Sequence, residues 1–221
     1  MKKIKLGVLI SGSGSNLQAI IDRIEAGRLS AEIVVVVSNE PDAYGLTRAR
    51  QHGLPNMVID HRQHPDRESF ERQILEVLRA HQVELVALAG FMRMITSTLI
   101  DAFPHRIMNI HPAILPAFPG THVWQQQLDY GIKFAGCTVH FVDRGMDTGP
   151  IIIQAVVPVL DEDTADTLAA RILKQEHRIY SAAIQLFAED RLRVQGRKVK
   201  VMPPIPVSEE MVMLNPPLTT G

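Results

Sequence analysis

The stretch Lys5–Ile20, KLGVLISGSGSNLQAI, decides the fold class. Its opening segment, Lys5–Ile10, is mostly apolar and predicts a buried strand, which a glycine-rich turn over Ser11–Ser15 follows. From Asn16 onward the apolar residues recur at helical spacing, which predicts a helix that ends near Gly27. A strand, a tight turn and a helix in this order indicate the first unit of an α/β domain.

The same alternation of strand and helix continues along the chain. We expect strands at 32–37, 56–59, 85–89 and 107–110 and helices at 45–52, 68–80, 97–103, 121–130 and 164–189. This order predicts a doubly wound α/β fold, in which helices cover both faces of a mostly parallel sheet. Two longer strands, 134–142 and 151–157, are expected to form an antiparallel carboxy-terminal portion. We expect a single domain over residues 1–200 and a proline-rich peripheral tail over residues 201–221.

The composition excludes several classes of protein. Lysine and arginine number 23 against 24 aspartate and glutamate, so the overall charge gives no reason to expect nucleic acid or a membrane as a partner. No apolar run is long enough to span a bilayer. The single cysteine, Cys137, excludes a disulfide framework and is expected to be a small core residue. These observations favour a soluble, cytoplasmic protein.

The glycine-rich turn is a candidate phosphate site. Glycines allow the backbone to approach a ligand closely, and a helix N-terminus offers free N–H groups to an anion. Gly14, Ser15 and Asn16 are the candidate phosphate-binding residues. A simple tight turn with a helix cap explains the same residues equally well. A dinucleotide site fits poorly, because Leu17 occupies the position of the third glycine and no clear ribose-binding acid follows the second strand.

A second candidate site follows the predicted strand 107–110. Asn109 and His111 are two residues apart, so in an extended chain their side chains lie on one face. An amide donor beside an imidazole suits acyl transfer, which needs oxyanion stabilisation and proton movement. Asp147 lies in the loop between the two long strands, and a carboxylate near a histidine favours its protonated form. Taken singly, each residue is better explained by local hydrogen bonding than by catalysis, and the histidines show no metal-ligand spacing.

Several segments together resemble one known family. They occur in the same order as in the phosphoribosylglycinamide formyltransferases, which are folate-dependent enzymes. The matching segments are Ile10–Ile20, Leu88–Arg93, Asn109–Pro112 with Leu115-Pro116 and Phe118–Gly120, Thr138–Val142, Asp147–Ile152 and Gln175–His177 with Tyr180. The resemblance covers most of the chain, from about Val8 to Tyr180. It implies a Rossmann-like sheet and an enzyme of purine biosynthesis.

The resemblance also implies a role for each matching residue. The expected reaction transfers the formyl group of 10-formyltetrahydrofolate to the amine of glycinamide ribonucleotide. Asn109, His111 and Asp147 would be catalytic, and Glu176 would lie near the substrate amine. The folate cosubstrate would be bound by Arg67, Met92, Arg93, Ile95 and Asp143. No metal is expected. Ala113 departs from the family, which commonly has serine there, and this puts only the local hydrogen bonding in doubt.

Other functions remain open from the sequence alone. A formyltetrahydrofolate hydrolase shares the same core but would ordinarily carry an additional amino-terminal domain. A methionyl-tRNA formyltransferase would need a further carboxy-terminal domain and a positive surface. A binding module for folate or nucleotide without catalysis, and a nicotinamide-dependent oxidoreductase, are the alternatives from other classes. A homodimer through the first helices is possible, although no sequence feature indicates one.

Overall fold

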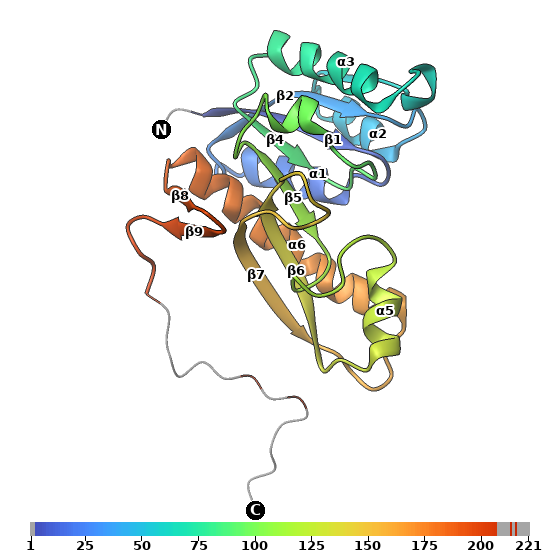
Figure 1. Ribbon diagram of the computed structural model, residues 1–221, viewed down its shortest axis with the longest axis vertical. Helices are drawn as coiled ribbons and strands as arrows, with labels where there is room; N and C mark the ends of the chain where they lie inside the picture. Colours follow the sequence, from blue (N-terminus) through green and yellow to red (C-terminus); the bar gives the residue numbers. More distant parts are fainter. Residues whose placement is uncertain (1–2, 207–212, 214, 216–221) are drawn as a thin grey trace, which may run out of the picture.

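The computed structural model describes residues 3–206, 213 and 215 of the chain. Its nine strands form one sheet in the order β3-β2-β1-β4-β5-β6-β7-β9-β8. The five strands of the amino-terminal half are parallel to one another and make up more than half of this sheet (Figure 1). They are β1 (Ile4–Ile10), β2 (Ala31–Ser38), β3 (Asn56–Val58), β4 (Leu85–Leu88) and β5 (Ile107–His111). The predicted doubly wound α/β fold is confirmed.

The carboxy-terminal strands change the direction of the sheet. β6 (Phe134–Phe141) runs antiparallel to β5, and β7 (Ile151–Pro158) runs antiparallel to β6, as the sequence predicted. A short hairpin of β8 (Leu192–Gln195) and β9 (Lys198–Val201) completes the sheet, with β9 parallel to β7. The sequence analysis did not predict this hairpin. Each of its strands has only four residues with two apolar positions, which is too weak a pattern to separate a strand from a loop.

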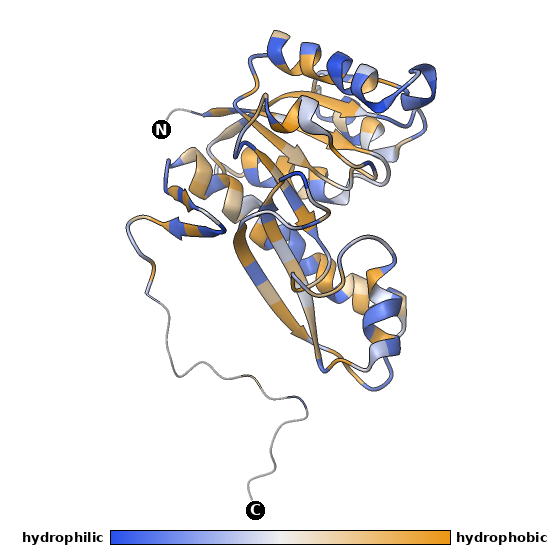
Figure 2. Ribbon diagram, viewed as in Figure 1, coloured by the Kyte–Doolittle hydropathy of each residue, from blue (hydrophilic) through white to orange (hydrophobic). Residues whose placement is uncertain are grey.

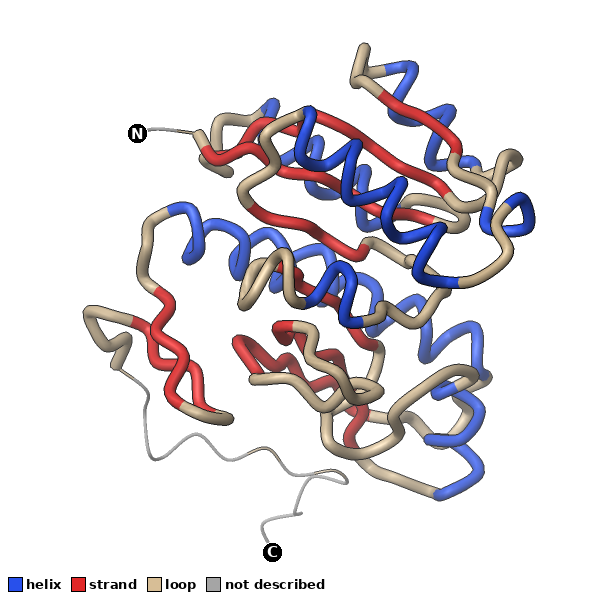
Figure 3. The backbone as a smooth tube through the Cα atoms, turned by 45° about the horizontal axis from the view of Figure 1, so that its top comes forward, coloured by secondary structure: helices blue, strands red, loops and turns tan. Residues whose placement is uncertain are grey.

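Helices cover both faces of the sheet (Figure 3). α1 (Ser15–Glu25), α2 (Tyr44–Gln51) and α6 (Ala165–Ala188) pack on one face, and α3 (Arg67–Ala80) and α4 (Ser97–Ile100) pack on the other. α5 (Val123–Tyr130) and the short 3-10 helix η1 (His61–Gln63) lie in connections. α4 and α5 are shorter than predicted, because turns replace their expected ends. None of the described helices is long and apolar enough to cross a membrane.

Two apolar layers hold this arrangement together. In β1 the side chains of Leu6, Val8 and Ile10 join the core under α1 and α6, whereas Leu9 joins the core under α3. This alternation is what a strand buried on both faces requires. Figure 2 shows apolar residues along the central strands and hydrophilic residues on the outer side of α3. Cys137 lies in the first core and is fully buried, as predicted for a small core residue.

The sheet brings the predicted site segments to one edge. β1, β4 and β5 are neighbours, and their carboxyl ends carry the glycine-rich loop, the segment from Gly90 and the residues Asn109 and His111. Leu88 pairs with both Leu9 and Asn109, so Asn109 lies two strand spacings, about 10 Å, from β1. The predicted tail begins where β9 ends; residues 207–212, 214 and 216–221 lie outside the described residues, so the predicted domain boundary stays a prediction.

Candidate active site

The glycine-rich loop is held against α2 by close backbone contact. Gly14 caps α1 in the left-handed conformation, with φ of 69°, which favours glycine. A Cβ atom at Gly14 would lie 2.6 Å from the Cα of Gly45, and the Gly45 N–H donates to the Gly12 carbonyl at 3.0 Å. The first N–H groups of α1, at Ser15 and Asn16, have no partner within the helix and are available to an anion. The loop therefore has the geometry of an anion site.

The side chain of Asn16 has a different partner from the one expected. Its Nδ2 donates to Oε2 of Glu176 at 2.8 Å, and the side chain is buried. A phosphate at this loop would therefore contact the backbone N–H of Asn16 rather than its amide. The Asn16 Oδ1 atom is buried and has no hydrogen-bond partner among the described residues. An unpaired buried acceptor favours a ligand that brings an N–H donor.

Burial controls the charge of Glu176. Its carboxyl group is buried on α6, and this desolvation raises its pKa, although the hydrogen bond from Asn16 lowers the pKa in part. A buried carboxyl group with a raised pKa holds its proton more readily than an exposed one does. Glu176 and Asn16 were predicted for separate subsites, and they are direct neighbours.

Asn109, His111 and Asp147 meet at the edge of the sheet, as their predicted roles require. Nδ1 of His111 lies 3.4 Å from Oδ2 of Asp147, and Nδ2 of Asn109 lies 3.4 Å from its Oδ1. The same Oδ2 accepts a hydrogen bond from the backbone N–H of Gly120 at 2.9 Å. Asp147 adopts a left-handed backbone with φ of 53°, which is uncommon outside glycine and turns its carboxylate towards β5.

The Asp147 carboxylate is stabilised in its charged form. Burial alone would raise its pKa, but the neighbouring imidazole of His140, the hydrogen bond from the Gly120 N–H and the imidazole of His111 outweigh burial and lower the pKa. His111 is buried, and its Nε2 donates to the carbonyl of Phe118 at 2.8 Å. Because Phe118 O and Asp147 both accept hydrogen bonds, the imidazole satisfies both neighbours when each ring nitrogen carries a hydrogen.

His140 completes this group and was not assigned a role from the sequence. Its Nδ1 donates to the Phe141 carbonyl at 2.9 Å, which leaves Nε2 as an acceptor. Nε2 lies 3.2 Å from Nδ2 of Asn109 and so fixes the orientation of that amide. This neighbour follows from the β5–β6 register, which places His140 opposite Asn109 and which the sequence does not display.

The candidate folate residues lie close to the glycine-rich loop. Met92 is 73% exposed, and its N–H donates to Oγ of Ser11 at 2.8 Å, which joins the two segments. The guanidinium of Arg93 stacks on the ring of Phe70 at 5.6 Å from its centre. Ile95 packs against the second core. Together these residues offer an exposed apolar side chain beside the glycine-rich loop and a cation over Phe70.

The remaining two folate candidates have different environments. Arg67 is the first residue of α3 and is exposed to solvent, without a contact to the other candidates. Asp143 uses its Oδ1 to accept hydrogen bonds from Gly145 N at 3.1 Å and from Thr148 Oγ1 at 2.6 Å. Asp143 therefore shapes the loop that carries Asp147, and its direct contact with a folate stays a prediction.

The segment that carries the folate candidates Met92, Arg93 and Ile95 is held by a buried carboxylate that the sequence analysis missed. Glu71 lies on the inner face of α3 and accepts hydrogen bonds from both N–H and Oγ1 of Thr96, each at 2.7 Å. Burial raises its pKa despite these bonds. The sequence did offer a signal for this residue, because Glu71 lies beside Phe70 and Ile74 on the apolar face of the helix. A carboxyl group at such a position is buried and needs a hydrogen-bond partner.

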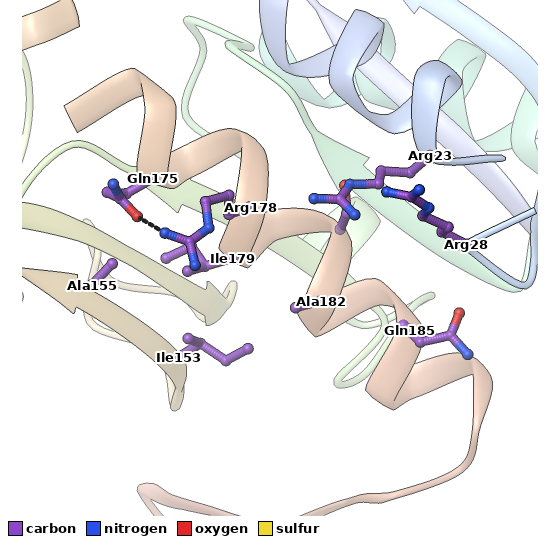
Figure 4. A pocket seen from close by; sticks show the side chains of 10 residues that line it. Arg23, Arg28, Ile153, Ala155, Gln175, Arg178, Ile179, Ala182 and Gln185 are labelled. Atoms are coloured by element: carbon purple, nitrogen blue, oxygen red, sulfur yellow. Dashed lines mark hydrogen bonds between the residues drawn. The ribbon is translucent and has the colours of Figure 1, made fainter. Parts of the chain in front are cut away.

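A separate hollow of about 460 Å³ lies against α6, between β7 and the end of α1. Figure 4 shows Arg23 and Arg28 side by side at one end and Arg178 beside Gln175 at the other. None of the candidate catalytic or substrate-binding residues lines it, so it is not part of the candidate active site. Within the described part of the chain, no group of three or more His, Cys, Asp or Glu residues is arranged to hold a metal ion.

Comparison with known proteins identifies the family. The sequence pattern that defines the formyl transferase family matches residues 4–184. The chain belongs to the formyl transferase family. A phosphoribosylglycinamide formyltransferase from Bacillus subtilis is 42% identical over 181 residues, which are 82% of this chain and 93% of that protein. The family assignment made from the ordered segments is therefore confirmed.

Solved structures of this family share the fold. A glycinamide ribonucleotide transformylase from Symbiobacterium toebii is 53% identical and superposes with a TM-score of 0.89, covering 90% of this chain and 94% of that one. A trifunctional purine biosynthetic protein from Drosophila melanogaster is 46% identical over 187 residues, which are 84% of this chain. The chain spans only 14% of that longer protein. The similarity to it therefore concerns one part of a multifunctional polypeptide.

Proposed function

We propose that this formyl transferase moves the formyl group of 10-formyltetrahydrofolate to the amine of glycinamide ribonucleotide, in cytoplasmic purine biosynthesis. The names of the relatives from Bacillus subtilis and Symbiobacterium toebii support this choice of substrates. The observation that carries the proposal is the meeting of Asn109, His111 and Asp147, with contacts of 3.4 Å, at the sheet edge beside an anion-binding loop. Small molecules are the proposed partners, rather than nucleic acid or a membrane.

The glycine-rich loop would bind the phosphate of the ribonucleotide. Gly14 allows the close approach, and the N–H groups of Ser15 and Asn16 at the start of α1 point out of the helix end. The positive end of the helix dipole adds to the attraction for an anion. One phosphate suits a loop of this length better than a pyrophosphate does.

Glu176 and Asn16 would receive the glycinamide amine. A primary amine must be unprotonated to attack a carbonyl, and a carboxyl whose pKa is raised by burial does not force the amine into its charged form. The unpaired Asn16 Oδ1 is an acceptor for one N–H of that amine. The two side chains therefore fit an amine that is held in its nucleophilic state.

The bond changes of the proposed reaction balance without a covalent enzyme intermediate. A bond forms between the amine nitrogen and the formyl carbon, and the bond from that carbon to the folate nitrogen breaks. One proton leaves the amine and one is added to the folate nitrogen. The folate cosubstrate supplies the formyl carbon, and the protein supplies donors for the charge that develops on the formyl oxygen.

Two donors are suited to that oxygen. The contact from Asn109 Nδ2 to Asp147 is 3.4 Å, longer than an ordinary hydrogen bond, so this N–H is held weakly and is available. The imidazole of His111 provides the second donor, and the Asp147 carboxylate stabilises positive charge on the ring. Each such donor contributes about 3 kcal/mol to an oxyanion-type transition state. His111 Nε2 would exchange its bond to Phe118 O for the substrate.

The folate would lie over Met92, Arg93 and Ile95. A planar ring system fits the exposed Met92 surface, and the stacked Arg93 offers N–H groups in a fixed plane. Arg67 would pair with a carboxylate of the folate tail, and Asp143 would act through the loop that it shapes. These residues fit a flat, acidic cosubstrate.

The nearest alternative is hydrolysis of formyltetrahydrofolate, because water could replace the amine at the same donors. A spectrophotometric assay of folate product from 10-formyltetrahydrofolate, with and without glycinamide ribonucleotide, separates the two. Product that forms only with the ribonucleotide supports the proposal. Product that forms equally without it identifies a hydrolase, and no product from folded protein favours a binding module.

A further inference from the structure

Arg48 is a cation beside the glycine-rich loop that no predicted role has used. It lies on α2, three residues after Gly45, whose backbone contacts Gly12 and Gly14 directly. Residues three apart on a helix lie on the same side, so the side chain of Arg48 is directed to the loop. Its Cδ atom would lie 3.5 Å from a Cβ at Gly14. The packing of two glycines thus brings a guanidinium to the start of α1.

The contacts of Arg48 fix its position but leave its charge uncompensated. Nε donates to the carbonyl of Ser13 at 2.9 Å, and Nη1 donates to Oε1 of Gln18 at 3.2 Å. The guanidinium carbon also lies 4.9 Å above the centre of the Tyr44 ring. All three partners are neutral, and among the described residues no carboxylate lies within ion-pair distance of Arg48. A half-buried arginine of this kind favours an anionic ligand.

The loop itself offers only neutral donors to a phosphate. Its N–H groups and the Ser15 hydroxyl can form hydrogen bonds, but a phosphate monoester carries between one and two negative charges at neutral pH. A guanidinium has five N–H groups; Arg48 uses two of them, which leaves three for a ligand. Arginine binds phosphate oxygens in pairs at a fixed geometry.

We propose that Arg48 is a substrate-binding residue that neutralises the phosphate of the ribonucleotide held at Ser13–Asn16. The inference rests on the proposed function for the identity of the substrate, but the phosphate subsite has its own test. Gln18 and Tyr44 keep the guanidinium in place before the substrate arrives, so little side-chain freedom is lost on binding. Arg48 thereby distinguishes a phosphorylated substrate from the corresponding nucleoside.

The first test compares two substrates in wild type and three variants. In Arg48→Gln, we expect KM for glycinamide ribonucleotide to rise about 10- to 100-fold, which is the usual effect of losing one hydrogen bond to a charged group. We expect kcat and the KM for the folate to stay unchanged. The unphosphorylated glycinamide riboside should show the same kcat/KM in wild type and variant. Arg48→Lys should recover part of the affinity. Arg50→Gln is the matched control, because Arg50 is exposed on the same helix and its side chain donates to Oγ1 of Thr47 rather than to the loop.

A purely structural role would give a different result. If Arg48 served only to hold the Ser13 carbonyl, Arg48→Gln would weaken the ribonucleotide and the riboside by the same factor. Equal losses with the two substrates, or an unchanged KM for the ribonucleotide, would overturn the proposal. Thermal unfolding of each variant shows whether the protein is folded.

Direct binding separates this inference from the proposed reaction. Calorimetry with ribose 5-phosphate requires no formyl transfer, and we expect binding to wild type and to Arg50→Gln that weakens at least tenfold in Arg48→Gln. If wild type shows this binding but no transfer, the proposed reaction fails and the Arg48 subsite stands. If transfer occurs and Arg48→Gln binds ribose 5-phosphate as wild type does, the Arg48 subsite fails and the reaction stands.

Discussion

The amide Nδ2 of Asn16 donates a 2.8 Å hydrogen bond to Oε2 of Glu176, although the two residues lie 160 positions apart in the chain. This bond joins the start of α1 to the middle of α6, and it connects the proposed phosphate and amine subsites. Glu176 is buried, and desolvation raises the pKa of its carboxyl group while the bond from Asn16 lowers it in part. The connection has consequences for stability as well as for substrate binding.

The stability of the protein should depend on pH through Glu176. A carboxyl group with a raised pKa in the folded state binds its proton more tightly there than in the unfolded chain. Its contribution to stability is therefore complete below the unfolded value of about 4.5 and is lost as pH rises through the raised folded pKa. Glu176→Gln remains neutral, so its free energy of unfolding should increase relative to wild type as pH rises from 4 to 8.

Urea unfolding across this pH range measures the effect. Glu189→Gln is the control, because its stability should change with pH in the opposite direction. Hydrogen bonds from Gln185 and Arg191 lower the pKa of Glu189, whereas burial raises the pKa of Glu176. Relative to wild type, that variant should become less stable as pH rises. If the difference in free energy of unfolding between Glu176→Gln and wild type stayed constant from pH 4 to 8, the assigned burial of this carboxyl group would be contradicted. In activity, Glu176→Gln should lower kcat/KM for the ribonucleotide by about 10- to 100-fold.

Substitution of the three catalytic candidates should reduce turnover. Asn109→Ala, His111→Ala and Asp147→Asn should each lower kcat by about 10²- to 10³-fold, the usual cost of losing one oxyanion donor or its support. KM for both substrates should change little, because these groups act mainly in the transition state. His122→Ala and Asp129→Asn, which alter exposed residues on or next to α5, should retain wild-type rates. Near-normal turnover in all three folded variants would disprove the assignment.

His140 should act through Asn109 rather than on the substrate. His140→Phe removes Nε2, the acceptor that lies 3.2 Å from Nδ2 of Asn109 and orients that amide. We therefore expect kcat to fall about tenfold and the KM values for both substrates to stay unchanged. His140→Gln, which restores an acceptor, should recover part of the loss. In an Asn109→Ala background, His140→Phe should have no further effect on kcat. Additive losses in the double variant would show that His140 does not work through Asn109.

Much of this arrangement was predictable from the sequence, and the reasons are physical. Lys5–Ile20 combines an apolar run, a glycine-rich turn and a helical pattern, three signals that favour the same βα unit. The ordered family segments then predicted that Asn109, His111 and Asp147 would meet, which spacing alone could not do. The antiparallel strands β6 and β7 supply that geometry, because the loop between them brings Asp147 to Asn109 and His111 on β5.

The remaining features depend on contacts that the sequence does not display. The orientation of Asn16 towards Glu176 and of Arg48 towards Ser13 arises from the packing of α1, α2 and α6, which share no local pattern. His140 was assigned no role from the sequence, because its partner is set by the β5–β6 register. The hairpin β8–β9 was missed because its strands are short and half polar.

The cysteine provides a simple check of the core. Burial raises the pKa of Cys137 to about 12, so its thiolate is scarce at neutral pH. We expect a thiol reagent such as dithionitrobenzoate to leave the native protein unmodified over an hour and to modify one thiol after addition of denaturant. Rapid modification of the native protein would place Cys137 outside the core and contradict the packing of β6 under α6.

The central claim is that the formyl carbon passes directly from the folate to the ribonucleotide amine. It is tested most directly with 10-formyltetrahydrofolate that carries ¹³C in the formyl group, with both products followed by mass spectrometry. We predict that the label appears in formylglycinamide ribonucleotide, in equal amount to the folate released, and that labelled formate is absent. Label that accumulates as free formate, at the same rate with and without the ribonucleotide, would contradict the account.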